Sequence, residues 1–179
     1  MNKDIEKLLK DKGGIRLDIG GGIAPQKGFV SMDYQDLPGI DIVHNWDDFP
    51  WPLPDESVLT AIASHVVEHV NPVNGHFIKW LDEVWRVLKV DGQIAIAAPY
   101  GGSPGYWQDP THCNGVTETT WHYFDPLSET GLYRFYEPAP WKIEVNTFHQ
   151  SGNVEVVLRK RLDDVSYHAD GKIKYGKTK

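Results

Sequence analysis

Cysteine is nearly absent from this chain of 179 residues, in which Cys113 is the single example. An intramolecular disulfide and a four-cysteine zinc site are therefore both excluded. Positive charge is also in deficit, with 18 Lys and Arg against 25 Asp and Glu and a formal net charge of −7. Because an acidic surface repels a phosphate backbone, we expect no general binding of nucleic acid.

Long apolar runs are missing as well. No segment approaches the roughly 18 apolar residues that cross a bilayer, and the charged residues 1–12 lack the apolar centre of a signal peptide. We therefore expect a cytoplasmic protein without membrane contact. The hydrophobic fraction of 40% is sufficient for the core of one domain. We place that domain at residues 1–165 and expect a flexible tail at residues 166–179.

The hydrophobic pattern alternates between strand and helix periods, which predicts an α/β fold. The expected strands are residues 15–19, 29–32, 41–43, 58–63, 93–98, 141–148 and 154–160, and the expected helices are residues 1–14 and 75–88. A turn-forming sequence at residues 150–153 joins the last two strands into a hairpin. The pattern thus predicts a mostly parallel sheet of about seven strands with an antiparallel edge.

Three glycines, Gly20 to Gly22, directly follow the first predicted strand. Glycines at this place let the backbone turn sharply and approach a ligand, although they also occur in simple turns. Residues 20–28 alone join the first two strands, and this is too short for a helical crossover of about a dozen residues. The helix that binds a pyrophosphate is therefore expected to be reduced to a turn, which disfavours a dinucleotide.

S-adenosylmethionine (SAM) carries no phosphate, so the loss of that helix matters less for SAM than for a dinucleotide. Asp18 is placed to meet the α-ammonium group of the methionine part. Asp33, at the end of the second predicted strand, is placed to accept hydrogen bonds from both ribose hydroxyls, since a carboxylate offers two acceptor oxygens.

Two stretches carry a family resemblance: LDIGGGIAPQKGFVSMDY with its continuation to SHVVEHV, and FIKWLDEVWRVLKVDGQIAIAAPY. Together they resemble the class I SAM-dependent methyltransferases, in particular the short type 11 group, whose first crossover helix is nearly gone. The resemblance implies a three-layer Rossmann-like methyltransferase fold, SAM as cofactor and S-adenosylhomocysteine as product. It covers roughly residues 15–100.

Carried onto this sequence, the resemblance implies a set of cofactor-binding residues along the ends of the first four strands. They are Asp18, Ile19, Gly20, Gly21, Gly22, Met32, Asp33, Tyr34, Asn45, Trp46, Ser64 and His65. Asn45 stands where the family usually has an acidic residue for the adenine amino group, and Asp47 and Asp48 just beyond it are the alternatives.

The aromatic segment at residues 100–136 follows the fifth strand, so we expect it to form a lid on the acceptor side. Asp109 and His112 are the expected orienting carboxylate and general base, because histidine ordinarily titrates near neutral pH. The alternative is that Asp-Pro-Thr-His is a capped turn. The expected substrate-side residues are Tyr100, Trp107, His112, Trp121 and Tyr123. Core packing is the alternative for the aromatic ones.

We expect no metal site. His112, Cys113, His122 and Asp109 are suitable ligand types, but their spacing matches no known zinc pattern. His65, Glu68 and His69 form a second polar cluster. The resemblance implies a largely structural role for Glu68 and His69, in capping and packing.

These features predict an enzyme that moves a methyl group from SAM to an oxygen or nitrogen of a small-molecule acceptor. A non-catalytic methyltransferase-like module that binds SAM or a partner is the alternative, and a dinucleotide-binding Rossmann protein is a third reading. The acceptor and the oligomeric state are left open.

Overall fold

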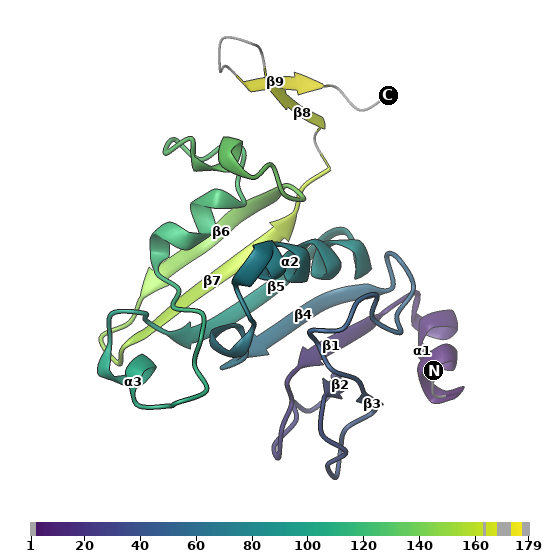
Figure 1. Ribbon diagram of the computed structural model, residues 1–179. Helices are drawn as coiled ribbons and strands as arrows, with labels where there is room; N and C mark the ends of the chain where they lie inside the picture. Colours follow the sequence, from purple (N-terminus) through teal and green to yellow (C-terminus); the bar gives the residue numbers. More distant parts are fainter. Residues whose placement is uncertain (1–2, 163, 168–172, 177–179) are drawn as a thin grey trace.

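The computed structural model describes residues 3–162, 164–167 and 173–176. Seven strands form one sheet in the order β3-β2-β1-β4-β5-β7-β6 (Figure 1). Its strands are β1 (Ile15–Ile19), β2 (Val30–Asp33), β3 (Ile42–Val43), β4 (Val58–Ser64), β5 (Leu88–Pro99), β6 (Trp141–Phe148) and β7 (Asn153–Lys160). The helices are α1 (Lys3–Lys12), α2 (His76–Val87) and α3 (Pro104–Trp107), with 3-10 turns η1 (Val67–His69), η2 (Val73–Gly75), η3 (Glu118–Tyr123) and η4 (Leu132–Phe135).

The strand directions confirm the predicted mixed sheet. β1 to β5 pair in parallel, whereas β7 runs antiparallel to both β5 and β6. The main difference from the prediction concerns β5, which begins at Leu88 instead of Gln93. The chain leaves α2 directly into this strand, and the register between β4 and β5 shifts after Val58 pairs with Leu88. The irregular pairing hid the start of the strand from the hydrophobic pattern.

No helix lies between β1 and β2, which confirms the predicted loss of the first crossover helix. Two turns replace it: the N–H of Ala24 donates to the carbonyl of Gly21, and the N–H of Phe29 donates to that of Gln26. The connection is therefore held by local backbone hydrogen bonds and presents no helix N-terminus to a ligand.

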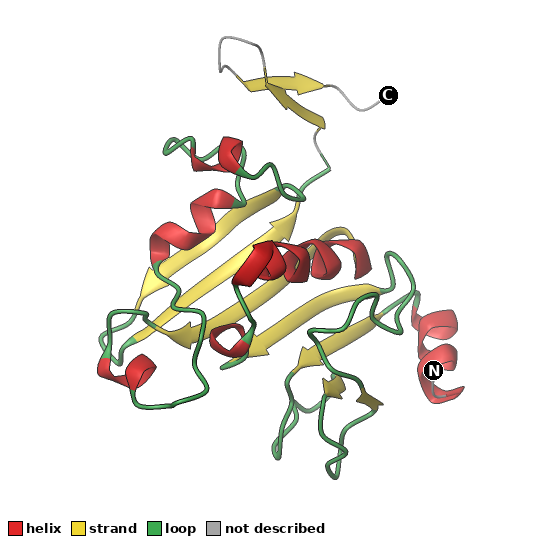
Figure 2. Cartoon of the chain, viewed as in Figure 1, coloured by secondary structure: helices red, strands yellow, loops and turns green. Residues whose placement is uncertain are grey.

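The core lies between the sheet and α2, which crosses one face of it (Figure 2). Trp80, Leu81 and Val84 of α2 are fully buried, as the three- and four-residue spacing of apolar residues predicts. Along β5, Ile94 and Ile96 are buried while Ala95 between them is exposed. Alternation of this kind means that the second face of the sheet is less completely covered.

At the opposite face we find α1 beside β1. Ile5 and Leu8 of α1 line a cavity of about 660 Å³ together with Arg16 and Leu59. The outer helical layer is thus thin here, in keeping with the short connections of this chain.

The flexible tail expected at residues 166–179 stays a prediction, and the structure describes a strand pair in this region. Two strands, β8 (Asp164–Tyr167) and β9 (Ile173–Gly176), pair in an antiparallel manner apart from the main sheet (Figure 1). β-branched and aromatic residues, which favour strands, occupy alternate positions at Val165, Tyr167, Ile173 and Tyr175. The remaining residues of the predicted tail, 168–172 and 177–179, lie outside the described residues.

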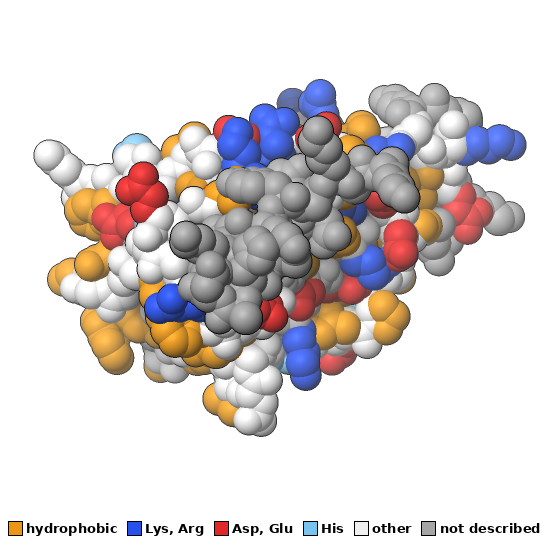
Figure 3. Space-filling view, turned by 90° about the horizontal axis from the view of Figure 1, so that it is seen from above, with side chains coloured by type: hydrophobic (Ala, Val, Ile, Leu, Met, Phe, Trp, Pro, Cys, Tyr) orange, Lys and Arg blue, Asp and Glu red, His pale blue; other side chains and the backbone are white. Residues whose placement is uncertain are grey.

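Basic and acidic side chains are interspersed on the face of the molecule seen from above (Figure 3). Among the residues described there, no broad patch of one sign is visible. In the described part of the chain, no helix combines the length and the apolar character that a membrane span requires.

Candidate functional site

The predicted cofactor residues lie at the carboxyl ends of the parallel strands. Asp18 and Ile19 end β1, Asp33 ends β2, and Ser64 ends β4. Because these strands are neighbours in the sheet, their ends form one edge. In open α/β sheets, this edge is where ligands bind.

The glycine turn at residues 20–22 depends on glycine at each position. Gly20 and Gly22 have φ angles of 72° and 55°, which disfavour a side chain. A Cβ on Gly21 would lie 2.0 Å from the Oγ of Ser31. The N–H of Gly20 donates to the carbonyl of Met32 over 2.8 Å. The turn is therefore packed tightly against the end of β2.

Two buried carboxylates flank this turn. Oδ2 of Asp33 accepts a hydrogen bond from the N–H of Gly22 over 3.0 Å, and Oδ1 accepts one from the N–H of Gln35 over 2.9 Å. Oδ2 of Asp18 accepts one from the N–H of Gln26 over 2.7 Å. Burial raises the pKa of the Asp18 carboxyl, the bond from Gln26 opposes the shift, and the charge of Asp33 adds to it. The two carboxylates thus make the turn electronegative.

An aromatic pair stands at the end of β2 and the loop after β3. Tyr34 is 53% exposed, and its ring meets Trp46 edge-on with centroids 5.1 Å apart. Oδ1 of Asn45 accepts a hydrogen bond from the N–H of Asp47 over 3.1 Å. Asp47 itself pairs with His76, at 3.1 Å between Oδ1 and Nε2. Both side-chain oxygens are thus engaged with protein groups, and the choice between Asn45 and its acidic neighbours stays a prediction.

Three residues of the predicted set have fully buried side chains, and their roles stay predictions. Met32, expected beside the adenosine, is fully buried in the core, and what it offers the turn is its backbone carbonyl. Trp121, expected on the substrate side, is also fully buried, and its ring packs against Phe77 of α2 at 6.2 Å between centroids. For Met32 and Trp121, the free energy gained by removing a large apolar side chain from water favours a place in the core. Ile19 at the end of β1 is likewise fully buried.

A cavity of about 890 Å³ lies beyond the carboxyl ends of β4 and β5, on the same edge of the sheet as the glycine turn. Its lining includes His65, Glu68, Tyr100, Asp109 and His112. The cavity therefore combines one predicted cofactor residue with both predicted catalytic residues. Such a volume suits a small molecule.

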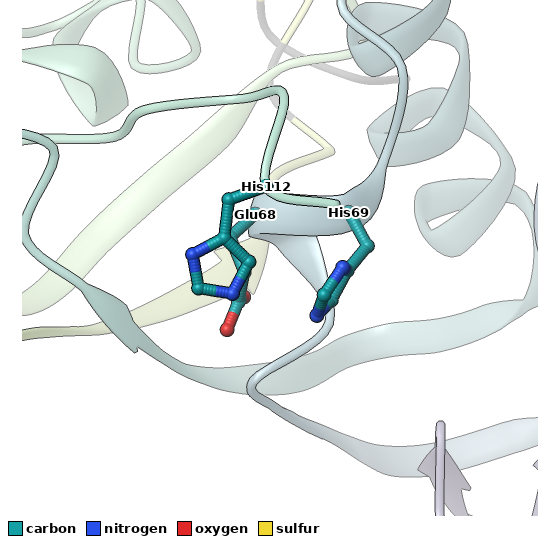
Figure 4. Close-up of side chains that lie close together, drawn as sticks. All are labelled: Glu68, His69 and His112. Carbon is teal, nitrogen blue, oxygen red and sulfur yellow. The ribbon is translucent and has the colours of Figure 1, made fainter. Parts of the chain in front are cut away.

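His112 stands at the centre of a cluster that sequence reasoning did not assemble. The ligand atoms of Glu68, His69 and His112 lie within 4.8 Å of one another (Figure 4). Glu68 and His69 come from η1, whereas His112 comes from the loop after α3. The sequence signal for this cluster is the run His-Val-Val-Glu-His at residues 65–69, in which the family resemblance gives Glu68 and His69 a largely structural role.

Backbone hydrogen bonds hold the two parts of this cluster together. The N–H groups of Cys113 and Asn114 both donate to the carbonyl of Glu68, over 2.9 and 3.0 Å. The side-chain amide of Asn114 donates to the carbonyl of Val67 over 2.9 Å. His112 is thus fixed beside Glu68 by its own neighbours in the chain.

Asp109 acts in the structure as the capping residue of its turn. Oδ1 accepts hydrogen bonds from the N–H and the hydroxyl of Thr111, over 2.8 and 2.7 Å. These bonds lower the pKa of the Asp109 carboxyl. Oδ2 lies 4.0 Å from Nε2 of His112, which is too long for a hydrogen bond. The hydrogen bonds of Asp109 are therefore those of a capped turn. Its carboxylate lies beside His112 without a hydrogen bond to it.

Glu68 is a completely buried acidic residue. Burial raises the pKa of its carboxyl, and the polar backbone N–H of Glu68 itself and the nearby His65, His69 and His112 oppose that shift. His65 adopts a left-handed conformation with φ of 56°, which a residue with a side chain seldom takes outside functional sites and turns. Its Nδ1 lies 3.2 Å from Oε1 of Glu68.

Some of the other aromatic residues of the predicted lid are exposed, and others pack against neighbouring rings. Tyr100 lines the cavity and meets Phe148 edge-on at 5.1 Å. Trp107 is 75% exposed. Tyr123 packs on Tyr136 at 5.6 Å between centroids. His122 lines a separate cavity, where its Nδ1 lies 2.8 Å from the Oγ of Ser128.

Comparison with solved structures identifies the fold. A SAM-dependent methyltransferase from Archaeoglobus fulgidus superposes with a TM-score of 0.57 at 17% identity, over 88% of this chain and 93% of that chain. One from Aquifex aeolicus gives 0.54 at 19% identity, over 88% and 90%. A putative methyltransferase in complex with the Haloferax volcanii Trm112 activator gives 0.55 at 12% identity, over 89% and 94%.

No protein-family model and no curated protein matches the sequence. The evidence from relatives is therefore structural, and it agrees with the strand order and with the antiparallel end of the sheet. The chain has the Rossmann-like fold of the class I SAM-dependent methyltransferases.

Proposed function

We propose that this protein binds SAM at the glycine turn and transfers its methyl group to an oxygen or nitrogen of a small molecule in the cavity beyond β4 and β5. The observation that carries the proposal is the pair of buried carboxylates beside the turn: Asp33 accepts a hydrogen bond from Gly22 of the turn, and Asp18 accepts one from Gln26 just after it. Two carboxylates repel a phosphate and attract a cation. SAM brings an α-ammonium and a sulfonium, and both are positive.

The rest of the turn supports the same ligand. No helix N-terminus is present to offset the charge of a pyrophosphate. Each carboxylate oxygen of Asp33 accepts one backbone N–H and keeps a second lone pair for a ribose hydroxyl. The exposed ring of Tyr34, braced by Trp46, offers a flat apolar surface for adenine.

Within the cavity, His112 is the group that receives the acceptor's proton. Its Nδ1 faces the carbonyl of Tyr106 at 2.6 Å and must donate to it, so the neutral ring keeps its lone pair on Nε2. When bound, SAM supplies a methyl carbon whose bond to sulfur breaks as the acceptor's electron pair bonds to it, leaving S-adenosylhomocysteine. The chain's part is alignment and removal of one proton.

The test is a screen of small-molecule acceptors with methyl-labelled SAM, followed by two variants. We expect His112→Ala to reduce transfer by about 100-fold or more, the usual contribution of a general base, while leaving SAM affinity within about twofold. His122→Ala, at the separate cavity, is the control and is expected to behave as wild type. If His112→Ala and Asp109→Ala both transfer at the wild-type rate, the catalytic assignment is wrong. Binding of SAM without transfer to any acceptor favours the non-catalytic module.

A further inference from the structure

The side chains of Glu68, His69 and His112 at the cavity wall face one another with hydrogen-bond acceptor atoms, and none of these atoms is a donor. Glu68 is fully buried, and neither of its carboxylate oxygens has a hydrogen-bond partner among the described residues. Nδ1 of His65 lies 3.2 Å from Oε1 but is not aligned for a hydrogen bond. A buried carboxylate without partners is costly unless a proton or a cation meets it.

The tautomers of the two histidines follow from their Nδ1 partners. Nδ1 of His112 donates to the carbonyl of Tyr106, so Nε2 carries a lone pair. Thr111 donates its hydroxyl proton to Asp109, so its oxygen must accept from Nδ1 of His69, 3.1 Å away. Nε2 of His69 therefore also carries a lone pair.

A histidine that binds a metal through one ring nitrogen typically donates the N–H of the other nitrogen to a carbonyl or to a carboxylate-linked group. His69 and His112 have this arrangement. In this chain the backbone carbonyl of Tyr106 orients one ring, and the Asp109–Thr111 pair orients the other. The two rings meet edge-on, with centroids 4.7 Å apart. Figure 4 shows both rings and the carboxylate directed at a common space.

We propose that Glu68, His69 and His112 form a binding site for one divalent transition-metal cation. Two imidazoles and a carboxylate are ligands of Zn²⁺, Co²⁺, Mn²⁺ and Fe²⁺, whereas Mg²⁺ and Ca²⁺ prefer oxygen alone. Ligands about 2.1 Å from a tetrahedral centre lie about 3.4 Å apart. The observed separations of up to 4.8 Å are longer, so a bound cation would have to draw the ligand atoms closer together.

Three protein ligands leave coordination positions open, as in catalytic metal sites. Because the cluster lines the cavity, the open positions face its interior. A role for the cation in the reaction rests on the proposed methyl transfer: it would bind an acceptor hydroxyl and lower its pKa, as it does for bound water. His112 would then be a ligand and not the base, and the proton of the acceptor hydroxyl would pass to solvent water. The acceptor class thereby narrows to molecules that present an oxygen.

The experiment uses the full chain stripped with a chelator and then titrated with Co²⁺, followed by visible absorption, and with Zn²⁺, followed by calorimetry. We expect one Co²⁺ per chain with a dissociation constant in the micromolar range. His112→Ala and His69→Ala should each weaken binding at least tenfold. His122→Ala, a histidine outside the cluster, should bind as wild type does. Glu68→Gln tests the carboxylate if its thermal transition matches that of wild type, and otherwise the histidine variants decide.

Binding far below one Co²⁺ per chain, or equal binding by His112→Ala and wild type, would overturn the site. In that case a proton, not a metal, meets Glu68. A parallel SAM titration of the same samples separates the two proposals. Metal binding without SAM binding leaves the metal site standing and removes the proposed function, and the reverse outcome does the opposite.

Discussion

Gly22 and Asp33 are joined by a hydrogen bond of 3.0 Å from the backbone N–H of the glycine to Oδ2 of the carboxylate. The residue that ends β2 thereby holds the turn that follows β1. The bond makes Asp33 both a support of the turn and, in our account, a ligand of the ribose. Both roles depend on the same side chain.

Asp33→Ala removes both roles at once. We expect the affinity for SAM to fall at least tenfold, because two acceptor oxygens are lost and Gly22 is released. Asp36→Ala, an exposed aspartate three residues further along, should leave the affinity unchanged. Calorimetry with SAM measures both. Equal losses in the two variants would point to a general charge effect and not to the Asp33 carboxylate.

Single and double variants of Gly21 and Ser31 test whether the glycine turn packs against β2. A methyl group on Gly21 collides with the Oγ of Ser31 at 2.0 Å, so Gly21→Ala should cost about 1–3 kcal/mol of unfolding free energy. Oγ of Ser31 is buried without a partner among the described residues, so Ser31→Ala should be nearly neutral. The double variant should regain most of the loss in chemical denaturation. A double variant as unstable as Gly21→Ala would show that the turn is packed differently.

Asp18 gives a prediction with a definite dependence on pH. Its pKa is raised in the fold, chiefly by burial. Such a group stabilises the fold below its unfolded pKa, and this contribution is lost as the pH rises through the folded pKa. Asp18→Asn carries no charge, so its melting temperature relative to wild type should increase between about pH 3 and about pH 7. The same variant should bind SAM more weakly. A melting-temperature difference that is constant over this range would contradict the assignment.

Alanine variants of Trp121 and Trp107 test which part of the predicted lid belongs to the core and which part is exposed. Trp121 is fully buried and Trp107 is 75% exposed. Trp121→Ala should cost about 3–5 kcal/mol of unfolding free energy. Trp107→Ala should change it by no more than about 0.5 kcal/mol. Urea denaturation followed by circular dichroism measures both. Similar losses in the two variants would be incompatible with the observed burial.

The sequence predicted the sheet well because its strands are bounded by clear turn signals. The residue ranges 15–19 and 141–148 are those of β1 and β6, and the helix predicted at 75–88 is α2, His76–Val87. The start of β5 was missed because of its irregular register with β4. β8 and β9 were missed because polar residues surround their few apolar ones.

The site was predicted less completely, for physical reasons. A family resemblance assigns positions to a site, but burial decides which side chains reach it, and Met32 and Trp121 turn inward. The cluster of Glu68, His69 and His112 joins two segments that are distant in the sequence. Backbone bonds from Cys113 and Asn114 to Glu68 bring the segments together, and no local pattern announces such bonds.

The most direct measurement of the central claim is a calorimetric titration of the wild-type protein with SAM, S-adenosylhomocysteine and NAD in parallel. We predict one binding site for SAM and S-adenosylhomocysteine with a micromolar dissociation constant, about 8 kcal/mol of binding free energy, and no heat from NAD. A folded sample that binds neither SAM nor S-adenosylhomocysteine, or that prefers NAD, would contradict it.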